Sequence, residues 1–527
     1  MRKHLLLIIF LLISTSVIAG TINVPADYDS IQVAIEAAEE GDIVLVQPGT
    51  YEDNIDFLGK GITVGSLFLT TQDTSYILET IIDGDSLDSV VRFQNGEDSS
   101  SVLCGFTITN GSSDSGAGIY MHNASPHLHN LNVIDNVGSS GGGIYCCLAS
   151  PEISQIFISE NVAGSGGGAM FINNSNARLK NLTIANNSTY YSGAGIYCGS
   201  NSEIDVYNVV IEYNQAGDYG YGGGIFCTTA SPNFENVILK GNRAYNGGAI
   251  ECYDYASPTM KHIIMENNSS NDGGGIFCWH YSSPQIEHAT ISHNDVDHNG
   301  AGIRCADHSS PSIINSIVSY NTGSYGIYAT TSSDPTVYYS DFYNNEDGNF
   351  YGVNDSLGVN TTTNAIGDSC DIFYNIQMEP KFADIAAGDY HLTQNSPCID
   401  AGDPTLPLDP DSTIADMGAY YYNQGATVDE ELFKDQLTDI VLFPNPVNPQ
   451  NQNFNAKFML KNPGKVSIKL YNIRGQMVSN ILDETRNSGS NTICQPLPIL
   501  PSGIYFVKLA LDRKNIAVQK VVLIKQF

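Results

Sequence analysis

Five side chains between residues 251 and 307 have the types that acid–base chemistry requires: Glu251, Asp254, His280, Arg304 and Asp307. Two carboxylates can act as general acid and base in glycoside hydrolysis, and a basic side chain can abstract a proton in a lyase reaction. Asp254, His280 and Asp307 each follow a cysteine at the same offset, so a repeating fold would align them in one column. We predict these five residues as the candidate catalytic set.

The spacing of this set leaves its chemistry open. Asp254 and Asp307 would lie two repeats apart, roughly 10 Å, which slightly exceeds the range expected for an inverting carboxylate pair. A lyase reaction would need a base to abstract a proton, for which Arg304 is the nearby candidate. The segment has no compact lyase or polygalacturonase motif, and ordinary solvated corners are the alternative interpretation.

Aromatic residues accompany the polar ones. Residues between an inward Ile and an inward Cys should face outward. These outward positions are Tyr120, Tyr145, Met170, Tyr197, Phe226, Glu251, Phe277, Arg304 and Tyr328. Aromatic faces stack on sugar rings, and the predicted carbohydrate-binding residues are Tyr197, Phe226, Phe277, Trp279 and Tyr281. Coverage by a loop, or simple stacking that stabilises a sheet, is the alternative.

A repeat of 24 to 29 residues must position these side chains. Each unit has a glycine run, a short Ile-x-Cys strand, a polar turn and a second strand that ends before asparagine. The asparagines are Asn136, Asn161, Asn187, Asn214, Asn242, Asn268, Asn294, Asn321 and Asn345. Short strands at such a period predict an all-β solenoid of stacked coils. Residues 22–422 resemble right-handed parallel β-helix proteins of the pectin-lyase-like class.

The repeat also assigns the interior. We predict that the asparagines form a structural ladder of stacked amides. An inward column of cysteines would consist of Cys146, Cys198, Cys227, Cys252, Cys278 and Cys305. We interpret these as buried, inert thiols, because parallel Cβ vectors on stacked strands bridge poorly. Cys370 and Cys398 lie outside the column and are the better candidates for a disulfide.

The N-terminal region predicts export and a capped solenoid. Residues 1–20 combine a basic start, a short apolar run and small residues, as a signal peptide does. The solenoid is expected over 21–424, with an amphipathic capping helix at 29–40. Asp29 and Gln32 resemble a capping box, and Gly41 would end the helix.

The end of the solenoid contains a candidate cation site. Residues 395–422 resemble the closing segment of bacterial surface β-helix proteins. Within them, Asp409, Asp411 and Asp416 could provide oxygen ligands for Ca²⁺. A solvated acidic turn is the favoured alternative.

The C-terminal region is a separate domain. Residues 425–440 are polar and acidic, as in a linker. Residues 441–527 contain Phe-Pro-Asn-Pro at 443–446, Tyr-Asn-Ile-Arg-Gly at 471–475, Gly-Ile-Tyr at 503–505 and a final basic strand. In this order they resemble the C-terminal sorting domain of the type IX secretion system. The resemblance implies a small immunoglobulin-like sandwich, the type IX machinery as partner, and export across an outer membrane.

Charge limits the partners. The chain has 56 acidic residues against 23 Lys and Arg, a net charge of −33. The residues from 433 onward are net positive, so the acidity belongs to the solenoid. We expect no nucleic-acid partner, no integral membrane segment in the mature chain, and no polyuronate ligand unless Ca²⁺ bridges the charges.

These features predict a secreted or cell-surface protein that binds glycan or another surface through its long outward face. A polysaccharide lyase or glycoside hydrolase acting on the late coils is one alternative. A structural surface component is another.

Overall fold

The structure is a computed structural model of the chain. It describes residues 19–330, 332–424, 437–443, 453–460, 464–472, 477–487, 489–496, 503–511 and 514–523. The chain divides into two compact units, residues 1–422 and 423–527. Residues 1–18 of the predicted signal peptide and 425–436 of the predicted linker lie outside the described residues.

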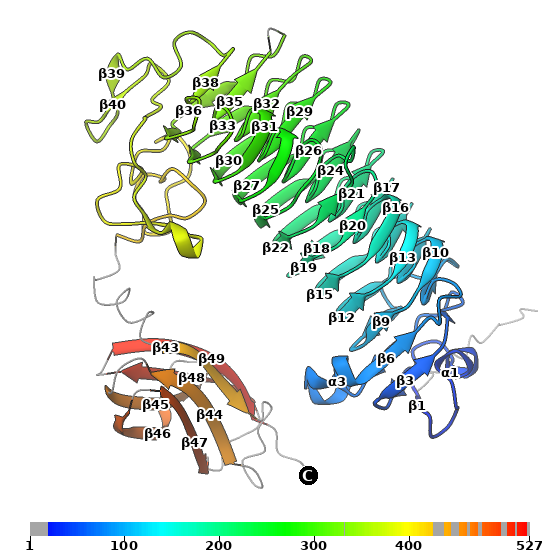
Figure 1. Cartoon of the computed structure of the whole chain (residues 1–527). Coiled ribbons are helices and arrows are strands. Elements are labelled where there is room, and N and C mark those ends of the chain that lie inside the picture. The colour runs from blue at the N-terminus through cyan, green and yellow to red at the C-terminus, as the bar shows by residue number, and fades with distance from the viewer. Residues whose placement is uncertain are drawn as a thin grey trace, which may run out of the picture. The chain divides into compact units, whose positions relative to one another are not determined.

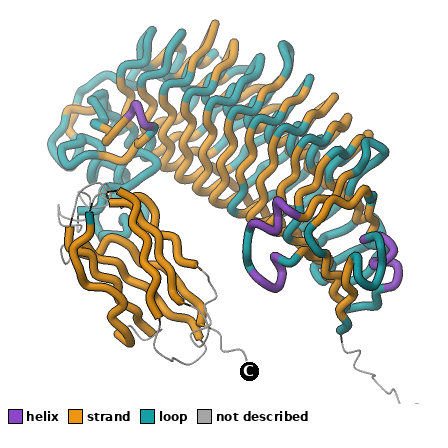
Figure 2. The backbone as a smooth tube through the Cα atoms, turned by 60° about the horizontal axis from the view of Figure 1, so that its bottom comes forward, coloured by secondary structure: helices purple, strands orange, loops and turns teal. Residues whose placement is uncertain are grey.

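The first unit is a parallel β-helix, in which successive coils stack strand on strand (Figures 1 and 2). A 12-stranded sheet runs along it, with every neighbouring pair parallel. Its strands are β4 (Ile55–Asp56), β7 (Val91–Phe93), β11 (Ile119–His122), β14 (Ile144–Cys147), β17 (Met170–Asn173), β21 (Ile196–Gly199), β24 (Ile225–Thr228), β26 (Ile250–Tyr253), β29 (Ile276–Trp279), β32 (Ile303–Cys305), β35 (Ile327–Ala329) and β38 (Phe350–Tyr351). This sheet carries the predicted Ile-x-Cys repeat.

A second parallel set of strands follows each polar turn. Its long members are β12 (His127–Ile134), β15 (Glu152–Ser159), β22 (Asp205–Glu212), β25 (Asn233–Lys240), β27 (Thr259–Glu266) and β30 (Gln285–Ser292). Three coils split this strand in two, giving β18 (Arg178–Lys180), β19 (Thr183–Ala185), β33 (Ser312–Ile314), β34 (Ile317–Ser319), β36 (Thr336–Tyr338) and β37 (Asp341–Tyr343). The first coils add β1 (Thr21–Val24), β2 (Ile43–Val46), β3 (Gly49–Glu52), β5 (Thr63–Ser66), β6 (Thr80–Asp83), β8 (Val102–Cys104) and β9 (Thr107–Thr109).

Shorter strands close the coils. They are β10 (Ser112–Ser115), β13 (Val137–Ser140), β16 (Val162–Gly166), β20 (Ser188–Thr189), β23 (Gln215–Ala216), β28 (Ser269–Asp272) and β31 (Asp295–Asn299). A glycine run follows each of these segments, and one glycine of the run is left-handed. At Gly273, which follows β28, φ is +68°, and an added Cβ would lie 2.6 Å from Cβ of Phe277. Glycine is therefore required where the chain turns into the 12-stranded sheet.

The N-terminal end carries three short helices, α1 (Ile31–Ala37), α2 (Phe68–Thr71) and α3 (Ser75–Glu79). Helix α1 is shorter than the expected 29–40. Its N-cap is Ser30, whose hydroxyl accepts the Val33 N–H at 3.2 Å, so the predicted capping role of Asp29 was wrong. Ile31, Ala34 and Ile35 are buried on the end of the first coils, which withdraws their apolar edges from solvent.

The coil interior contains the two predicted columns. Each ladder asparagine from Asn136 to Asn321 donates its Nδ2 to Oδ1 of the next, at 2.8–3.0 Å. All of them are buried, so the ladder prediction is confirmed. The column cysteines are buried free thiols, interrupted once by Ile172. Burial raises the pKa of Cys146 and Cys305 to about 12, which keeps these thiols protonated.

The segment after the last coil folds back along the body. It contains β39 (Thr362–Thr363), β40 (Ser369–Cys370), β41 (Phe382–Asp384), the 3₁₀ turn η1 (Ile385–Ala387) and β42 (Asp389–Leu392). The buried Tyr390 hydroxyl donates to Glu266 Oε2 at 3.0 Å, and Lys240 Nζ lies 2.8 Å from the other oxygen of that carboxylate. This buried network anchors the segment to strands β25 and β27.

Cys370 and Cys398 are both buried free thiols, so the prediction of a disulfide between them was wrong. The Cys398 Sγ lies 3.6 Å from Oδ2 of Asp341. Burial raises the pKa of Asp341 to about 8. Both cysteines pack in the apolar cluster under the closing segment, where thiols serve as small hydrophobic groups.

The C-terminal unit contains two antiparallel sheets. One sheet consists of β43 (Leu437–Phe443), β44 (Asn453–Leu460) and β47 (Gly489–Pro496). The other consists of β45 (Gly464–Asn472), β46 (Met477–Arg486), β48 (Gly503–Leu511) and β49 (Lys514–Leu523). Residues on both sheets, including Ala456, Ile468 and Leu509, are buried, as in a small β-sandwich.

Candidate functional site

The outward side of the 12-stranded sheet begins as a ladder of stacked rings. The centroids of Tyr120, Tyr145, Phe171, Tyr197 and Phe226 follow one another at 5.5, 5.3, 4.5 and 5.4 Å. Offset stacking at these distances stabilises neighbouring strands. The predicted ligand residue Tyr197 is half-buried within this ladder.

One position of the predicted stripe was wrong. Met170 pairs with Ile144 and Ile196 and is buried, whereas Phe171 pairs with Tyr145 and Tyr197. The left-handed glycine lies three residues before the inward residue here (Gly167 to Met170) as in the preceding coil, but this coil has an extra residue before its glycine run, and Ala169 takes the place of the last glycine. Counting from the glycines therefore shifts the face by one residue.

The middle of the outward stripe is covered. Phe226, Glu251 and Phe277 are only 6%, 1% and 6% exposed. The ring of Tyr253 lies 6.2 Å from that of Phe226, and the ring of Trp279 lies 6.0 Å from that of Phe277. The predicted contact of Phe226 and Phe277 with a ligand is corrected, because Tyr253 and Trp279, the last residues of β26 and β29, shield the two rings.

Glu251 cannot be an open catalytic acid in this arrangement. Burial raises its pKa well above the ordinary value, which favours the neutral carboxyl. Its Oε2 is buried without a hydrogen-bond partner among the described residues. The expectation that Glu251 lies open to solvent is therefore corrected, and its catalytic role stays a prediction.

Arg304 lies two coils from Glu251, with Phe277 between them in the register. Its guanidinium covers the Tyr328 ring at 4.4 Å, and its Nε lies 3.6 Å from Oδ1 of Asp272. Arg304 thus stabilises the late part of the ring ladder, and the structure does not bring it to Glu251.

The turn after the sheet brings part of the predicted polar column together. Asp254, His280 and Asp307 occupy equivalent left-handed positions, with φ of 52°, 54° and 50°. His280 Nδ1 lies 2.8 Å from Oδ1 of Asp254, and both side chains are accessible. Asp307 instead pairs with its neighbour His308, at 3.1 Å between Oδ1 and Nδ1.

The next residue of each turn forms a second, exposed ladder. Tyr255 and Tyr281 stack at 5.2 Å, and Tyr281 and His308 stack at 4.8 Å. Beside them, Trp279 meets Tyr253 edge to face at 5.6 Å. We call Tyr253, Tyr255, Trp279, Tyr281 and His308 the aromatic shelf.

The shelf is open to solvent. Tyr255 is 60% exposed, Tyr281 43% and Trp279 36%. Trp279 and Tyr281 were predicted from the sequence as ligand residues, whereas Tyr253, Tyr255 and His308 were missed. Their signal was the repeat itself, because they occupy the same turn offsets as Trp279 and Tyr281 in adjacent coils.

The three carboxylates proposed for Ca²⁺ have other partners. Asp409 Oδ2 accepts the Asp416 N–H at 2.9 Å, and Asp411 Oδ1 accepts from Thr413. Asp416 accepts the N–H groups of Asp400 and Tyr422, at 2.7 and 2.6 Å. Across the part of the chain that the structure describes, no group of three His, Cys, Asp or Glu side chains is arranged to hold a metal. The carboxylates fit a role in shaping the closing turn better than a cation site.

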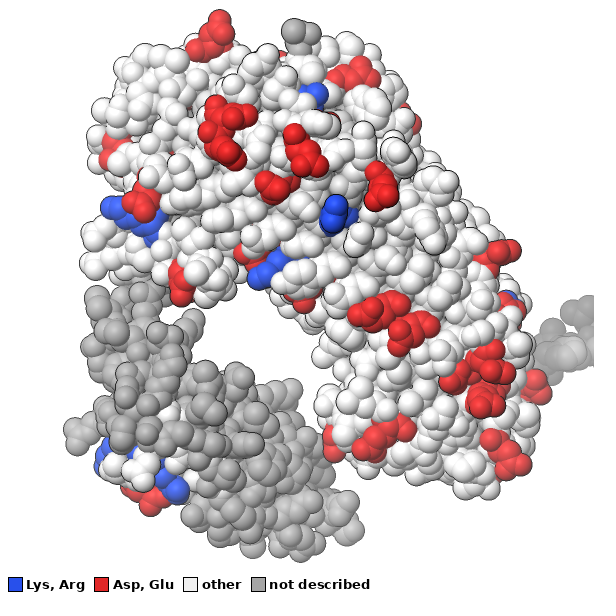
Figure 3. All heavy atoms as spheres, viewed as in Figure 1, with Lys and Arg blue, Asp and Glu red and all other residues white. Residues whose placement is uncertain are grey.

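The electrostatic character of the body is acidic. On the face shown in Figure 3, Asp and Glu are spread over the β-helix, whereas Lys and Arg are few. The ionisable side chains at the aromatic shelf are its own His308 and the neighbouring Asp254, His280 and Asp307. A polyanion would therefore be repelled along this surface.

Comparisons with known proteins agree on the two parts of the chain. The family model for the right-handed beta helix region matches residues 95–261 and 255–377, more than half of the chain. The model for the secretion system C-terminal sorting domain matches residues 441–525. No curated protein matches the chain.

Several solved structures are similar at low identity. The crystal structure of pectate lyase Pel9A is 12% identical, covering 75% of this chain and 91% of that one, with a TM-score of 0.33. Pectin methylesterase from carrot is 11% identical, covering 64% and 85%, with a TM-score of 0.25. The Siphovirus 9NA tailspike receptor binding domain is 12% identical, covering 95% and 98%, with a TM-score of 0.25. Similarity at this level says nothing about catalysis in the present chain.

The C-terminal sorting domain marks the chain for export. Among the residues that the structure describes, no helix is long and apolar enough to cross a bilayer. The stacked parallel coils and the family match together show that the chain belongs to the right-handed β-helix family.

Proposed function

We propose that this exported protein, once secreted or attached to the cell surface, binds a neutral glycan through the aromatic shelf. The observation that carries the proposal is the exposed ring ladder of Tyr255, Tyr281 and His308 beside Trp279. Exposed aromatic groups in a row are costly to leave in water unless a partner covers them.

The shelf combines two features that sugar recognition needs. Ring faces and edges offer apolar surface for the C–H side of a pyranose. The adjacent Asp254–His280 pair offers directional hydrogen bonds to hydroxyl groups, because the carboxylate accepts and the imidazole can donate or accept. The regular coil spacing would place successive sugar units over successive coils.

The charge of the body favours a neutral ligand. Net acidity and the carboxylates of Asp254 and Asp307 oppose a polyuronate. A neutral polysaccharide suffers no such repulsion. This support for the ligand class is electrostatic and independent of the stacking argument.

Binding to a panel of neutral and acidic polysaccharides tests the proposal. Trp279→Ala and Tyr281→Ala should each weaken binding to a neutral glycan about fivefold to tenfold, the loss of roughly 1 kcal/mol of stacking. Tyr207→Ala is the matched control, because Tyr207 has the same 43% exposure as Tyr281 but lies on β22, away from the shelf. Equal effects of the Tyr207 and Tyr281 variants, or binding to none of the glycans, would contradict the proposal.

The same incubations address the lyase or hydrolase alternative, which the contact between Asp254 and His280 keeps open. New reducing ends or unsaturated products that disappear with Asp254→Asn and His280→Gln would replace the binding proposal with an enzymatic one. Retention on a neutral glycan without products supports binding alone. Retention on none would favour a structural surface component.

A further inference from the structure

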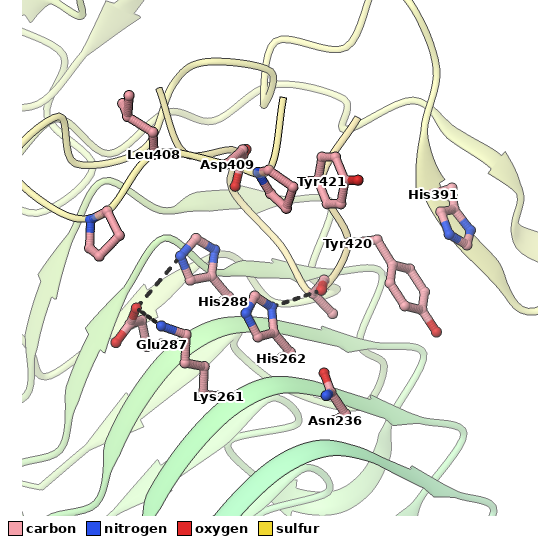
Figure 4. Close-up of a pocket in the computed structure, with 13 residues that line it drawn as sticks. Asn236, Lys261, His262, Glu287, His288, His391, Leu408, Asp409, Tyr420 and Tyr421 are labelled. Atoms are coloured by element: carbon pink, nitrogen blue, oxygen red, sulfur yellow. Dashed lines mark hydrogen bonds and ion pairs between the residues drawn. The ribbon is translucent and has the colours of Figure 1, made fainter. Parts of the chain in front are cut away.

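A partly enclosed cavity lies away from the aromatic shelf, where the closing segment covers strands β25, β27 and β30. The cavity has a volume of about 360 Å³. Figure 4 shows its floor, with Lys261 and His262 from β27 and Glu287 and His288 from β30, and its roof, which includes Leu408. A space of this size is at the small end of the range for small-molecule sites.

The floor arises from a change in one repeat column. The long strands bend at a left-handed residue, which is Asn181, Asn208 and Asn236 in three successive coils. The next two coils have His262 and His288 there, with φ of 54° and 51°. Their imidazole rings stack at 5.0 Å and face the closing segment. Histidine is one of the few side chains that tolerates this backbone region, so the substitution adds ring surface without altering the bend.

The roof is held in place by specific bonds. The Ala419 N–H donates to Thr290 Oγ1 at 3.0 Å, and the Ala419 carbonyl lies 3.2 Å from Nδ1 of His262. The Asp403 N–H donates to Oδ1 of Asn315 at 2.8 Å. Bonds on both sides of the roof mean that the cavity is already formed in the free protein, which lowers the entropic cost of binding.

The lining has little net charge. Lys261 Nζ lies 2.9 Å from Oε1 of Glu287, so these two charges compensate each other. Burial lowers the pKa of His288 to about 4 and also lowers the pKa of His262, which leaves both rings neutral near pH 7. Burial raises the pKa of Asp409 to about 6, which limits its charge in mildly acidic solution.

The lining also has mixed polarity. The carbonyl of Ala419 can only accept, so neutral His262 donates from Nδ1 and keeps Nε2 as an acceptor. Asn236 provides an amide on the floor, whereas Leu408 and Tyr421 provide apolar and ring surface on the roof. A ligand with hydroxyl groups on one side and C–H surface on the other can bond to the polar floor and pack against the apolar roof.

We propose that this cavity binds one or two rings of a neutral sugar, as a site separate from the aromatic shelf. An anionic ligand would find no unpaired cation opposite it, and the carboxylate of Asp409, which is ionised at pH 7, would repel it. The cavity lies against β27 and β30, whereas the shelf lies at the ends of β26 and β29 and on the turns after β26, β29 and β32. Loss of one site should therefore leave the other intact.

The test uses the full chain and named probes: glucose, galactose, mannose, xylose, cellobiose and lactose, with galacturonate and glucosamine as charged comparisons. Calorimetry identifies the binders, and imidazole NMR signals report whether His262 and His288 respond. At least one neutral sugar should bind and shift these signals. His262→Asn should weaken that binding at least fivefold, and Leu408→Ala should weaken it as well.

Matched variants separate the possible outcomes. His262→Asn introduces the residue that the same column has at Asn236, so folding should be preserved. His293→Asn is the control, because His293 is also left-handed, with φ of 56°, but lies outside the cavity. Trp279→Ala, which tests the shelf, should not affect this binding.

The proposal fails if no neutral sugar binds, or if only galacturonate or glucosamine does. It also fails if His262→Asn leaves binding unchanged, or if binding is lost with Trp279→Ala and retained with His262→Asn. The last result would assign all binding to the shelf, so this proposal can fail while the proposed function stands.

Discussion

Replacing Asn214 with alanine should strongly destabilise the middle of the β-helix. The Asn214 Oδ1 accepts from the backbone N–H of Asn187 at 2.9 Å and from its Nδ2 at 3.0 Å. The Asn214 Nδ2 donates to the Ile184 carbonyl and to Asn242 Oδ1, both at 3.0 Å. The side chain is 0% exposed, so water cannot replace these four bonds.

The expected cost follows from these contacts. A net loss of about 0.5–1.5 kcal/mol for each neutral hydrogen bond, together with a buried Asn187 N–H left without a partner, amounts to about 3–5 kcal/mol. Asn208→Gly is the control from the same coil. Asn208 is also an asparagine with a left-handed backbone, but it makes one exposed side-chain bond, to Asn181, so its loss should cost less than about 1 kcal/mol.

Denaturant unfolding of the full chain measures the change, and hydrogen exchange at the Asn187 amide locates it. A solenoid can open locally because each coil contacts only its neighbours, so exchange around residue 187 should accelerate before global unfolding shifts. A change below about 1 kcal/mol in both measurements would refute the view that the ladder is a main source of stability.

An aspartate at the same position gives a second signature. Asn214→Asp keeps one acceptor oxygen but turns the second oxygen toward the acceptors Ile184 O and Asn242 Oδ1. Its carboxyl should be protonated in the fold, so its folded pKa is raised above the unfolded value. Stability of this variant should then be greatest at low pH and fall as pH rises. A pH-independent Asn214→Asp variant would contradict this reasoning.

Other buried groups give four further predictions. Glu251→Met should raise the free energy of unfolding at pH 7 by about 1–3 kcal/mol, because it removes a buried acid with a raised pKa; a less stable variant in denaturant titration would contradict this. Asp341 has a folded pKa of about 8, above its unfolded value, so between pH 6.5 and 8 the wild type should lose about 1–2 kcal/mol of unfolding free energy that Asp341→Asn retains. The buried histidines, whose pKa values are lowered, are neutral above pH 6.5 and do not oppose this trend. Parallel stability curves for the two proteins over this pH range would refute the prediction. Tyr390→Phe removes the bond to Glu266 and should cost about 1–3 kcal/mol, seen as faster proteolysis of residues 377–422 than in wild type; an unchanged rate would count against the anchoring role. In native thiol labelling followed by site-resolved mass spectrometry, Cys147 should react first among the body cysteines, because the others are buried; equal labelling of the interior column would show that the coils open readily.

The repeat in the sequence determined most of the fold. Its period placed the Ile-x-Cys strands, the inward cysteines and the asparagine ladder from Asn136 to Asn345, because in stacked parallel coils the residues at equal repeat offsets must lie above one another. The same offsets aligned Asp254 with His280. The prediction slipped by one residue only at Met170, because an extra residue before the glycine run of that coil shifted the count.

Tertiary structure decided which of those residues can meet a ligand. Alternation marks Phe226, Glu251 and Phe277 as outward, but the rings of Tyr253 and Trp279 fold over this part of the stripe and bury it. Alternation also marks Tyr253 and Trp279, the last residues of β26 and β29, as outward, but it does not say that their rings lie over Phe226 and Phe277.

The second site needed the whole fold. His262 and Ala419 are 157 residues apart in the chain, and their contact forms where the closing segment docks on the coils. The sequence by itself therefore determined the coils, their interior columns and the sorting domain, because these follow from local periodicity and specific motifs. Only the tertiary structure decided the covered stripe, the exposed shelf and the cavity, because each depends on contacts between elements whose docking no repeat encodes.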